Sequence, residues 1–169
     1  LTATQLKALA TAQIKALTVT QIGELTTTQM GGLTSTHVGS LTTAQLQTLN
    51  TAQLSALSPV QIAGLAAVQM KELDSQWIGL LTTTQLASLT ATQIGGLTAT
   101  QVSGLTTTQV VRLTTAQVRG LTAADLTALT TEQVGLTSTQ IRSLTTAQIT
   151  GLAVANMVAL TTTQLGSLT

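Results

Sequence analysis

Side chains that could act in catalysis or bind a metal are few in this 169-residue chain, and they are scattered along it. His37 is the only histidine, and there is no cysteine. Metal sites and acid–base catalysis need several titratable groups that converge on one point. No second histidine, cysteine or acidic cluster lies at ligand spacing from His37, which favours a polar structural role for it. We expect no enzyme activity and no catalytic, metal-binding or cofactor-binding residue.

The remaining candidates for ligand binding also have structural explanations. Trp77 is the only aromatic residue, and it could stack on a sugar or a partner, but Leu80 nearby favours local packing. Serine and threonine are abundant but have no candidate base beside them. The glycine pairs, such as Gly31 with Gly32, belong to no phosphate-binding motif. Calcium-loop patterns are absent, and we expect no small-molecule ligand.

The charge composition excludes further classes of partner. Charged residues make up 7% of the chain, against about 25% in an ordinary domain, and the net charge is +1. Six separated basic residues without an aromatic series argue against a nucleic-acid groove. The apolar residues alternate with Thr and Gln and never approach the run of about 20 that a spanning helix needs. We expect neither nucleic-acid binding nor membrane insertion, whereas a nearly neutral surface favours self-association.

The elements that carry these side chains follow from an eight-residue repeat. Its consensus is L-T-x-x-Q-Φ-x-x, where Φ is Leu, Ile, Val or Met. Leucine opens each octad from Leu1 to Leu129. The eight-residue spacing restarts at Leu136, after a unit of seven residues, 129–135. We interpret residues 1–169 as one repeat domain of 21 units and expect it to be an excerpt of a longer array.

The second and fifth places of the octad predict the start of a short helix. Thr at the second place is replaced only by Asn50, Ser58, Asp74 and three alanines, and Thr, Asn, Ser and Asp are the residues that cap helix N-termini. Gln at the fifth place, in 17 of 21 units, completes a capping box. Three units have alanine at the second place and should begin their helices least well: Ala10, Ala66 and Ala153.

The seventh and eighth places predict the end of that helix. All 13 glycines lie there, and we expect them to stop the helix in a left-handed conformation. All six basic residues lie there too, where the helix dipole favours cations. The single proline, Pro59, follows the cap Ser58 and so takes the first helical position, which tolerates a missing N–H.

A period of eight cannot continue along one helix, because the apolar stripe would rotate by roughly 80° per octad. We predict an all-α solenoid with one helix of one and a half turns per octad, stabilised by packing of the Leu and Φ rows. A β-solenoid is the alternative. The number of octads per turn is open; two would give a rod on the order of 90 Å long, and three is the other choice.

The units LTTAQVRGL (113–121) and LTTAQITGL (144–152) resemble the octapeptide arrays of very large bacterial surface-exposed or secreted proteins, often labelled adhesin-like or haem-utilisation-like. The resemblance implies an extracellular or cell-surface location, and we carry over no haem-binding residue from it. We expect a structural repeat segment that forms a stalk or a self-associating filament. The alternative is a surface that binds ice or repetitive carbohydrate through threonine rows, such as 26–28, 82–84 and 106–108.

Overall fold

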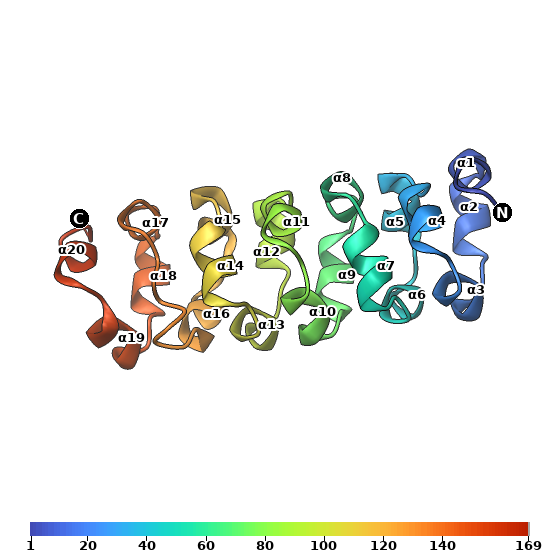
Figure 1. Cartoon of the computed structure of the whole chain (residues 1–169). Coiled ribbons are helices and arrows are strands. Elements are labelled where there is room, and N and C mark those ends of the chain that lie inside the picture. The colour runs from blue at the N-terminus through green and yellow to red at the C-terminus, as the bar shows by residue number, and fades with distance from the viewer. Residues whose placement is uncertain (169) are drawn as a thin grey trace.

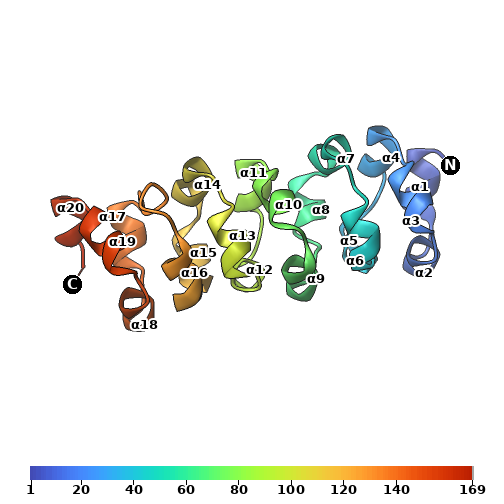
Figure 2. The same cartoon turned by 90° about the horizontal axis from the view of Figure 1, so that it is seen from below.

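The computed structural model describes residues 1–168 and shows an elongated rod of short helices, with the termini at opposite ends (Figures 1 and 2). All secondary structure in these residues is helical, so the all-α prediction is confirmed and the β-solenoid alternative is wrong. The helices have four to six residues. They are α1 (Ala3–Ala8), α2 (Thr11–Lys15), α3 (Val19–Gly23), α4 (Thr27–Gly31), α5 (Ser35–Ser40), α6 (Thr43–Gln47), α7 (Thr51–Ala56), α8 (Pro59–Ile62), α9 (Ala67–Glu72), α10 (Ser75–Gly79), α11 (Thr83–Ala87), α12 (Ala91–Gly95), α13 (Ala99–Ser103), α14 (Thr107–Arg112), α15 (Thr115–Gly120), α16 (Ala123–Ala128), α17 (Ser138–Arg142), α18 (Thr146–Thr150), α19 (Val154–Ala159) and α20 (Thr162–Leu165).

Three octads make one turn of the superhelix, which we call a coil. Helices pack on the helix three units away: α1 packs on α4, α2 on α5 and α3 on α6. The helices therefore form three columns along the rod, and a coil contains 24 residues. The two-octad alternative is wrong, and 21 units form seven coils with a length of about 60 Å rather than 90 Å.

The core is a continuous column of aliphatic side chains inside the three helix columns. The Φ side chains are buried from Leu6 in the first coil to Ile141 in the sixth. The repeat leucines are buried from Leu33 to Leu160. Burying one such side chain contributes about 1.5–3 kcal/mol. Helices of five or six residues are unstable alone, so this packing between octads is what holds each of them.

The helices begin as the octad predicts. Thr18, for example, is extended (φ −70°, ψ 159°), and its hydroxyl accepts the backbone N–H of Gln21 at 3.1 Å while Gln21 Oε1 accepts the N–H of Thr18. Ser58 caps α8 with Pro59 at its first position, which confirms the explanation of the proline. The alanines at 10, 66 and 153 provide no side-chain cap, although Gln13 and Gln69 still accept the N–H groups of Ala10 and Ala66.

The helices end differently from the prediction. No residue among 1–168 has a positive φ, so no glycine is left-handed. Gly32, for example, is right-handed (φ −79°, ψ −15°). At the helix ends the next repeat leucine instead donates its N–H to the Φ carbonyl three residues back, as Leu41 does to Val38 at 3.2 Å. Where that leucine is itself the C-cap, as Leu41 is, its backbone is extended (φ −60°, ψ 141°). The six basic residues do lie in the last helical turns, as predicted.

Many of the glycines, though not Gly31, allow a close approach between successive coils. A Cβ on Gly96 would lie 2.9 Å from the carbonyl oxygen of Ala67, which is 29 residues earlier in the same column. Gly32, Gly64 and Gly120 meet the same third-place backbone of the preceding coil even more closely. Where the eighth place has a hydroxyl instead, it can bond that carbonyl, as Ser88 Oγ bonds Pro59 O at 2.9 Å.

The seven-residue unit 129–135 forms a turn over residues 131–134 instead of the expected helix. Thr130 and Gln133 still make both capping-box bonds, and the N–H of Val134 still bonds the carbonyl of Thr130. With one residue fewer, the chain must reach the next column at once, and Leu136 N–H bonds Val134 O two residues back. The pKa of the exposed Glu132 is lowered, chiefly because its own backbone N–H and the Thr130 hydroxyl donate to the carboxylate.

The role of glycine in close approach can be tested by one matched pair of substitutions. Gly120→Ala places a methyl group against the carbonyl of Ala91, so we expect a loss of about 1–3 kcal/mol. Gly31→Ala, also at the last residue of its helix, meets nothing within 4 Å and should gain about 0.5–1 kcal/mol through helix propensity. Thermal unfolding followed by circular dichroism measures both. Equal effects of the two substitutions would contradict the role in close approach.

Candidate functional site

The side chain at the fifth place makes two sets of hydrogen bonds, one within its octad and one to the preceding coil. In Gln117, Oε1 accepts the N–H of Thr114 at 2.8 Å, which is the capping-box bond. Its Nε2 donates to the carbonyl oxygens of Leu86 (2.8 Å) and Leu89 (2.7 Å) in the coil below. Gln117 is only 2% exposed. One primary amide thus starts a helix and joins two coils.

This bridge to the repeat leucine of the preceding coil recurs along the described rod, and we call the set of donors the glutamine ladder. The separation is 28 residues where no short unit intervenes, and 27 across unit 129–135. The donors are Gln29, His37, Gln45, Gln53, Gln61, Gln69, Gln85, Gln93, Gln101, Gln109, Gln117, Gln133, Gln140, Gln148, Asn156 and Gln164.

The sequence analysis assigned Gln to the capping box but missed the bond between coils. A signal for it was present. A capping box accepts Glu as readily as Gln, yet Glu never occupies the fifth place in this chain. Only the amide supplies an N–H₂ donor, so the exclusive use of Gln over Glu indicates that the donor is needed.

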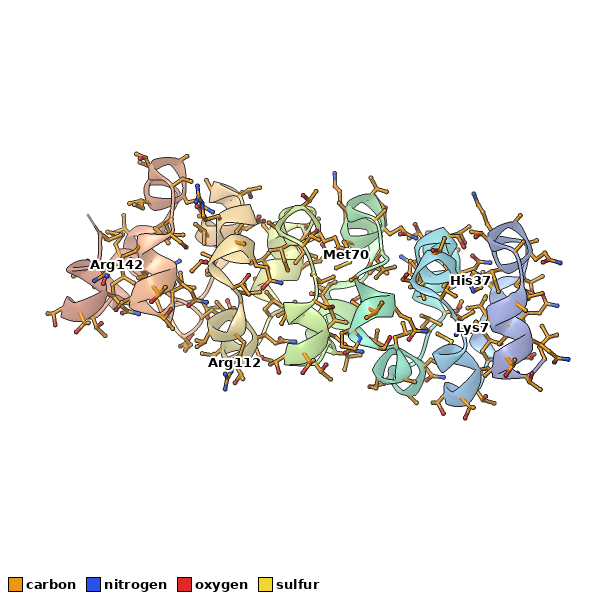
Figure 3. The ribbon with its side chains drawn as sticks, turned by 90° about the horizontal axis from the view of Figure 1, so that it is seen from above. Lys7, His37, Met70, Arg112 and Arg142 are labelled. Atoms are coloured by element: carbon orange, nitrogen blue, oxygen red, sulfur yellow. The ribbon has the colours of Figure 1, made fainter. Side chains whose placement is uncertain are left out.

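His37 reproduces both bonds of the glutamine it replaces. Its Nδ1 accepts the N–H of Thr34 at 3.3 Å, and its Nε2 lies 3.0 Å from the carbonyl oxygen of Leu9, 28 residues earlier. These partners assign the hydrogen to Nε2, with Nδ1 as the acceptor. His37 is buried, with 4% of the residue exposed. Figure 3 labels its position in the rod. The prediction that His37 is a polar substitute at the box position is confirmed.

Two of the other three exceptions, Asn156 and Asp125, each keep one of the two sets of bonds. Asn156 keeps the bonds between coils, to Leu126 (3.3 Å) and Leu129 (3.0 Å), but among the described bonds it accepts nothing from Ala153. Asp125 keeps the capping box and has no donor for the carbonyl of Leu97.

Trp77 is buried in the core at 6% exposure, as expected for a packing role, and its Nε1–H has no partner. Leu80, the neighbour that favoured local packing in the sequence, is itself 45% exposed.

The threonine triplets do not form one row. The first threonine of each triplet is used as a cap, by Thr26, Thr82 and Thr106. Residues 82–84 and 106–108 precede and open α11 and α14, which are neighbours in one column. Residues 26–28 belong with α4, which packs on α1 and α7 in another column. Residues 59 and 60, Pro and Val, interrupt the shared column one coil earlier.

The described residues contain no group of three or more His, Asp or Glu side chains placed to hold a metal. Arg112 lies at the margin of the rod in Figure 3. Within residues 1–168, no helix has the length and apolar character required to cross a membrane. The arrangement that recurs is therefore a contact between coils, built from the glutamine ladder and the two aliphatic rows.

Comparison with known proteins agrees with the repeat. A family model described as the ALTTAQ repeat matches residues 1–35. A search of the curated proteins finds no match. The match supports an octapeptide repeat array of the kind that the sequence analysis described, at the level of the repeat itself.

The ladder bond can be tested by a substitution that preserves the capping box. Gln117→Glu keeps an acceptor for Thr114, but it removes the donor to Leu86 and Leu89 and turns a buried carboxylate toward their carbonyls. We expect a loss of about 3 kcal/mol in unfolding free energy. Gln5→Glu is the control, because Gln5 is exposed and makes only the capping-box bonds. It should change stability by less than about 0.5 kcal/mol. Chemical denaturation of both variants decides between a ladder and a simple box.

The reverse substitution at the imperfect rung should stabilise the protein. Asp125→Gln keeps the acceptor for the N–H of Thr122 and adds a donor within reach of the Leu97 carbonyl, by analogy with Gln117 and Leu89. We expect a gain of about 1 kcal/mol. A higher melting temperature of the purified variant is the measurement. An unchanged or lower value would mean that the rung at Asp125 is already satisfied in another way.

Proposed function

We propose that this chain is a structural repeat segment, a rod-like stalk or filament body of an extracellular bacterial protein, without catalytic activity. The observation that carries the proposal is that each coil bonds to the coils before and after it through the same ladder and the same aliphatic rows. Length in such a solenoid is proportional to the number of repeats. A structure that adds length without adding new kinds of site suits a spacer.

The surface composition supports the same role. The exposed places of the octad carry mostly Thr, Ala, Ser and Gly, and few charges. The extracellular setting rests on the resemblance of the LTTAQ-type units to bacterial surface arrays, and the self-associating form rests on the low charge density. The interrupted threonine rows give no comparable support to binding of ice or a regular polysaccharide.

The spacer proposal predicts a shape and its dependence on length. Small-angle scattering of the 169-residue chain should give a rod about 60–70 Å long. Duplicating residues 81–104, which adds one coil of 24 residues, should lengthen the rod by about 9 Å and leave its cross-section unchanged. A thicker particle, or a compact one, would contradict the proposal.

The location is tested separately. Antibodies against the repeat should label intact, unpermeabilised cells of the producing bacterium, and brief protease treatment of those cells should remove the label. Labelling that appears only after permeabilisation would reject the extracellular setting while leaving the spacer role untouched.

A further inference from the structure

The glutamine ladder is complete along two of the three helix columns and is interrupted twice along the third. We number the columns by their first helix, so that column 1 starts at α1, column 2 at α2 and column 3 at α3. In columns 2 and 3, each repeat leucine carbonyl from Leu9 to Leu136 accepts a bond from the ladder side chain of the next coil. In column 1, the carbonyls of Leu49 and Leu97 accept none among the described bonds. Trp77 and Asp125 occupy the two ladder places that would face them.

Trp77 leaves unpaired groups on both sides of its contact. The residue is buried, and its Nε1–H has no acceptor. The carbonyl of Leu49, in the preceding coil, has no donor among the described bonds. The helix α10 also begins without a capping box, since Asp74 accepts the N–H of Gln76 at 2.7 Å but no described side chain bonds the N–H of Asp74. A buried polar group without a partner favours any state in which it reaches water.

The helices on either side of this gap are also not closely packed. In column 1, α4 packs on α7 and α10 packs on α13, whereas α7 and α10 do not form a close pair. An indole is much larger than the amide that it replaces, which accounts for the separation. In column 3, α6 and α9 are not a close pair either, but Gln69 and Gln47 span them with bonds to the carbonyls of Leu41 and Glu72. Among the described contacts within a column, only that between α7 and α10 lacks both close packing and an amide bond.

The gap at Asp125 differs from the gap at Trp77 in each of these respects. Asp125 keeps its capping box with Thr122, and the short side chain leaves no buried donor without a partner. Its helix, α16, packs closely on α13. The loss of a ladder bond alone therefore leaves the two coils in contact, and the bulk and the unpaired N–H of Trp77 distinguish the contact between α7 and α10.

The other two columns stay bonded at the same boundary, between the third coil (α7 to α9) and the fourth coil (α10 to α12). In column 2, Gln85 donates to the carbonyls of Leu54 at 3.1 Å and Leu57 at 2.8 Å. In column 3, Gln93 donates to those of Ala63 and Leu65. If the fourth coil tilts about these two contacts, column 1 opens, and water reaches both the Nε1–H of Trp77 and the carbonyl of Leu49.

We propose that the boundary between the third and fourth coils is a hinge, which opens in column 1 around Trp77 while columns 2 and 3 keep their bonds. This inference rests on the proposed rod and adds a direction in which the rod bends. A few residues at the ends of short elements are enough to absorb such a motion. Because only one column opens, the part of the rod beyond the hinge swings toward the side of columns 2 and 3.

Paired spin labels can detect this opening, because the chain has no cysteine of its own. Thr28→Cys combined with Gln76→Cys places two labels at exposed fourth places of column 1, two coils apart and on opposite sides of the hinge. Thr36→Cys combined with Thr84→Cys is the matched pair in column 2. Double electron–electron resonance should give a broad distribution that extends to longer distances for the column 1 pair, and a narrow distribution for the column 2 pair.

Trp77→Gln should close the hinge, since it supplies a donor for the Leu49 carbonyl, by analogy with Gln101 and Leu73. The column 1 distribution should then become as narrow as that of column 2, and the backbone amides of residues 73–81 should exchange hydrogen about 10-fold more slowly. If the single substitution fails to fold, exchanging residues 73–80 for the sequence of residues 113–120 makes the same test. Asp125→Gln repairs the other gap in column 1 and is the control, which should change neither measurement.

Two results would overturn the hinge. One is an equally narrow distribution for both label pairs in the chain that keeps Trp77. The other is a column 1 distribution that stays broad after Trp77 is replaced. If small-angle scattering still shows the rod, either result rejects the hinge alone, whereas a compact particle would reject the rod itself.

Discussion

The structure depends on a primary amide that makes two kinds of hydrogen bond, one within its octad and one to the preceding coil. The oxygen of the fifth-place glutamine fixes the start of its own helix, and the nitrogen holds the coil before it. Because both bonds belong to one side chain, helix formation and stacking are coupled wherever glutamine makes both, whereas Asn156 and Asp125 each keep only one set of bonds. This coupling explains how helices of four to six residues, far below the length that is stable in water, persist through the described rod.

Local structure followed from the sequence because its signals act over three or four residues. Capping residues, the box glutamine and Pro59 each have a meaning that depends only on their neighbours in the chain. Contacts between coils span 24 or more residues, and nothing in an octad states how many octads complete a turn. The number of columns is decided by how the Leu and Φ side chains fill the space between helices, which a repeat pattern alone does not encode.

The glycines show where a correct position led to a wrong mechanism. Their concentration at the end of each octad suggested left-handed caps, but no glycine among residues 1–168 has a positive φ, and at positions such as Gly64 and Gly120 the absent Cβ makes room for the backbone of the preceding coil. Two physical requirements, a special φ and a close approach, select the same residue. The fifth place gave a clearer signal. Because glutamate never occurs there, the side chain is needed for its N–H₂ donor as well as for its acceptor oxygen.

Unit 129–135 shows how the rod tolerates a repeat that is one residue short. One residue is missing, a helix is lost, and yet Gln140 reaches Leu113 with the same bond that Gln117 makes to Leu89. The shift caused by the missing residue is confined to unit 129–135, and the following octads keep their positions relative to the preceding coil. The fold therefore tolerates the deletion of a single codon within one octad. In a long helix or a coiled coil, the same deletion would shift the buried face throughout the remaining length.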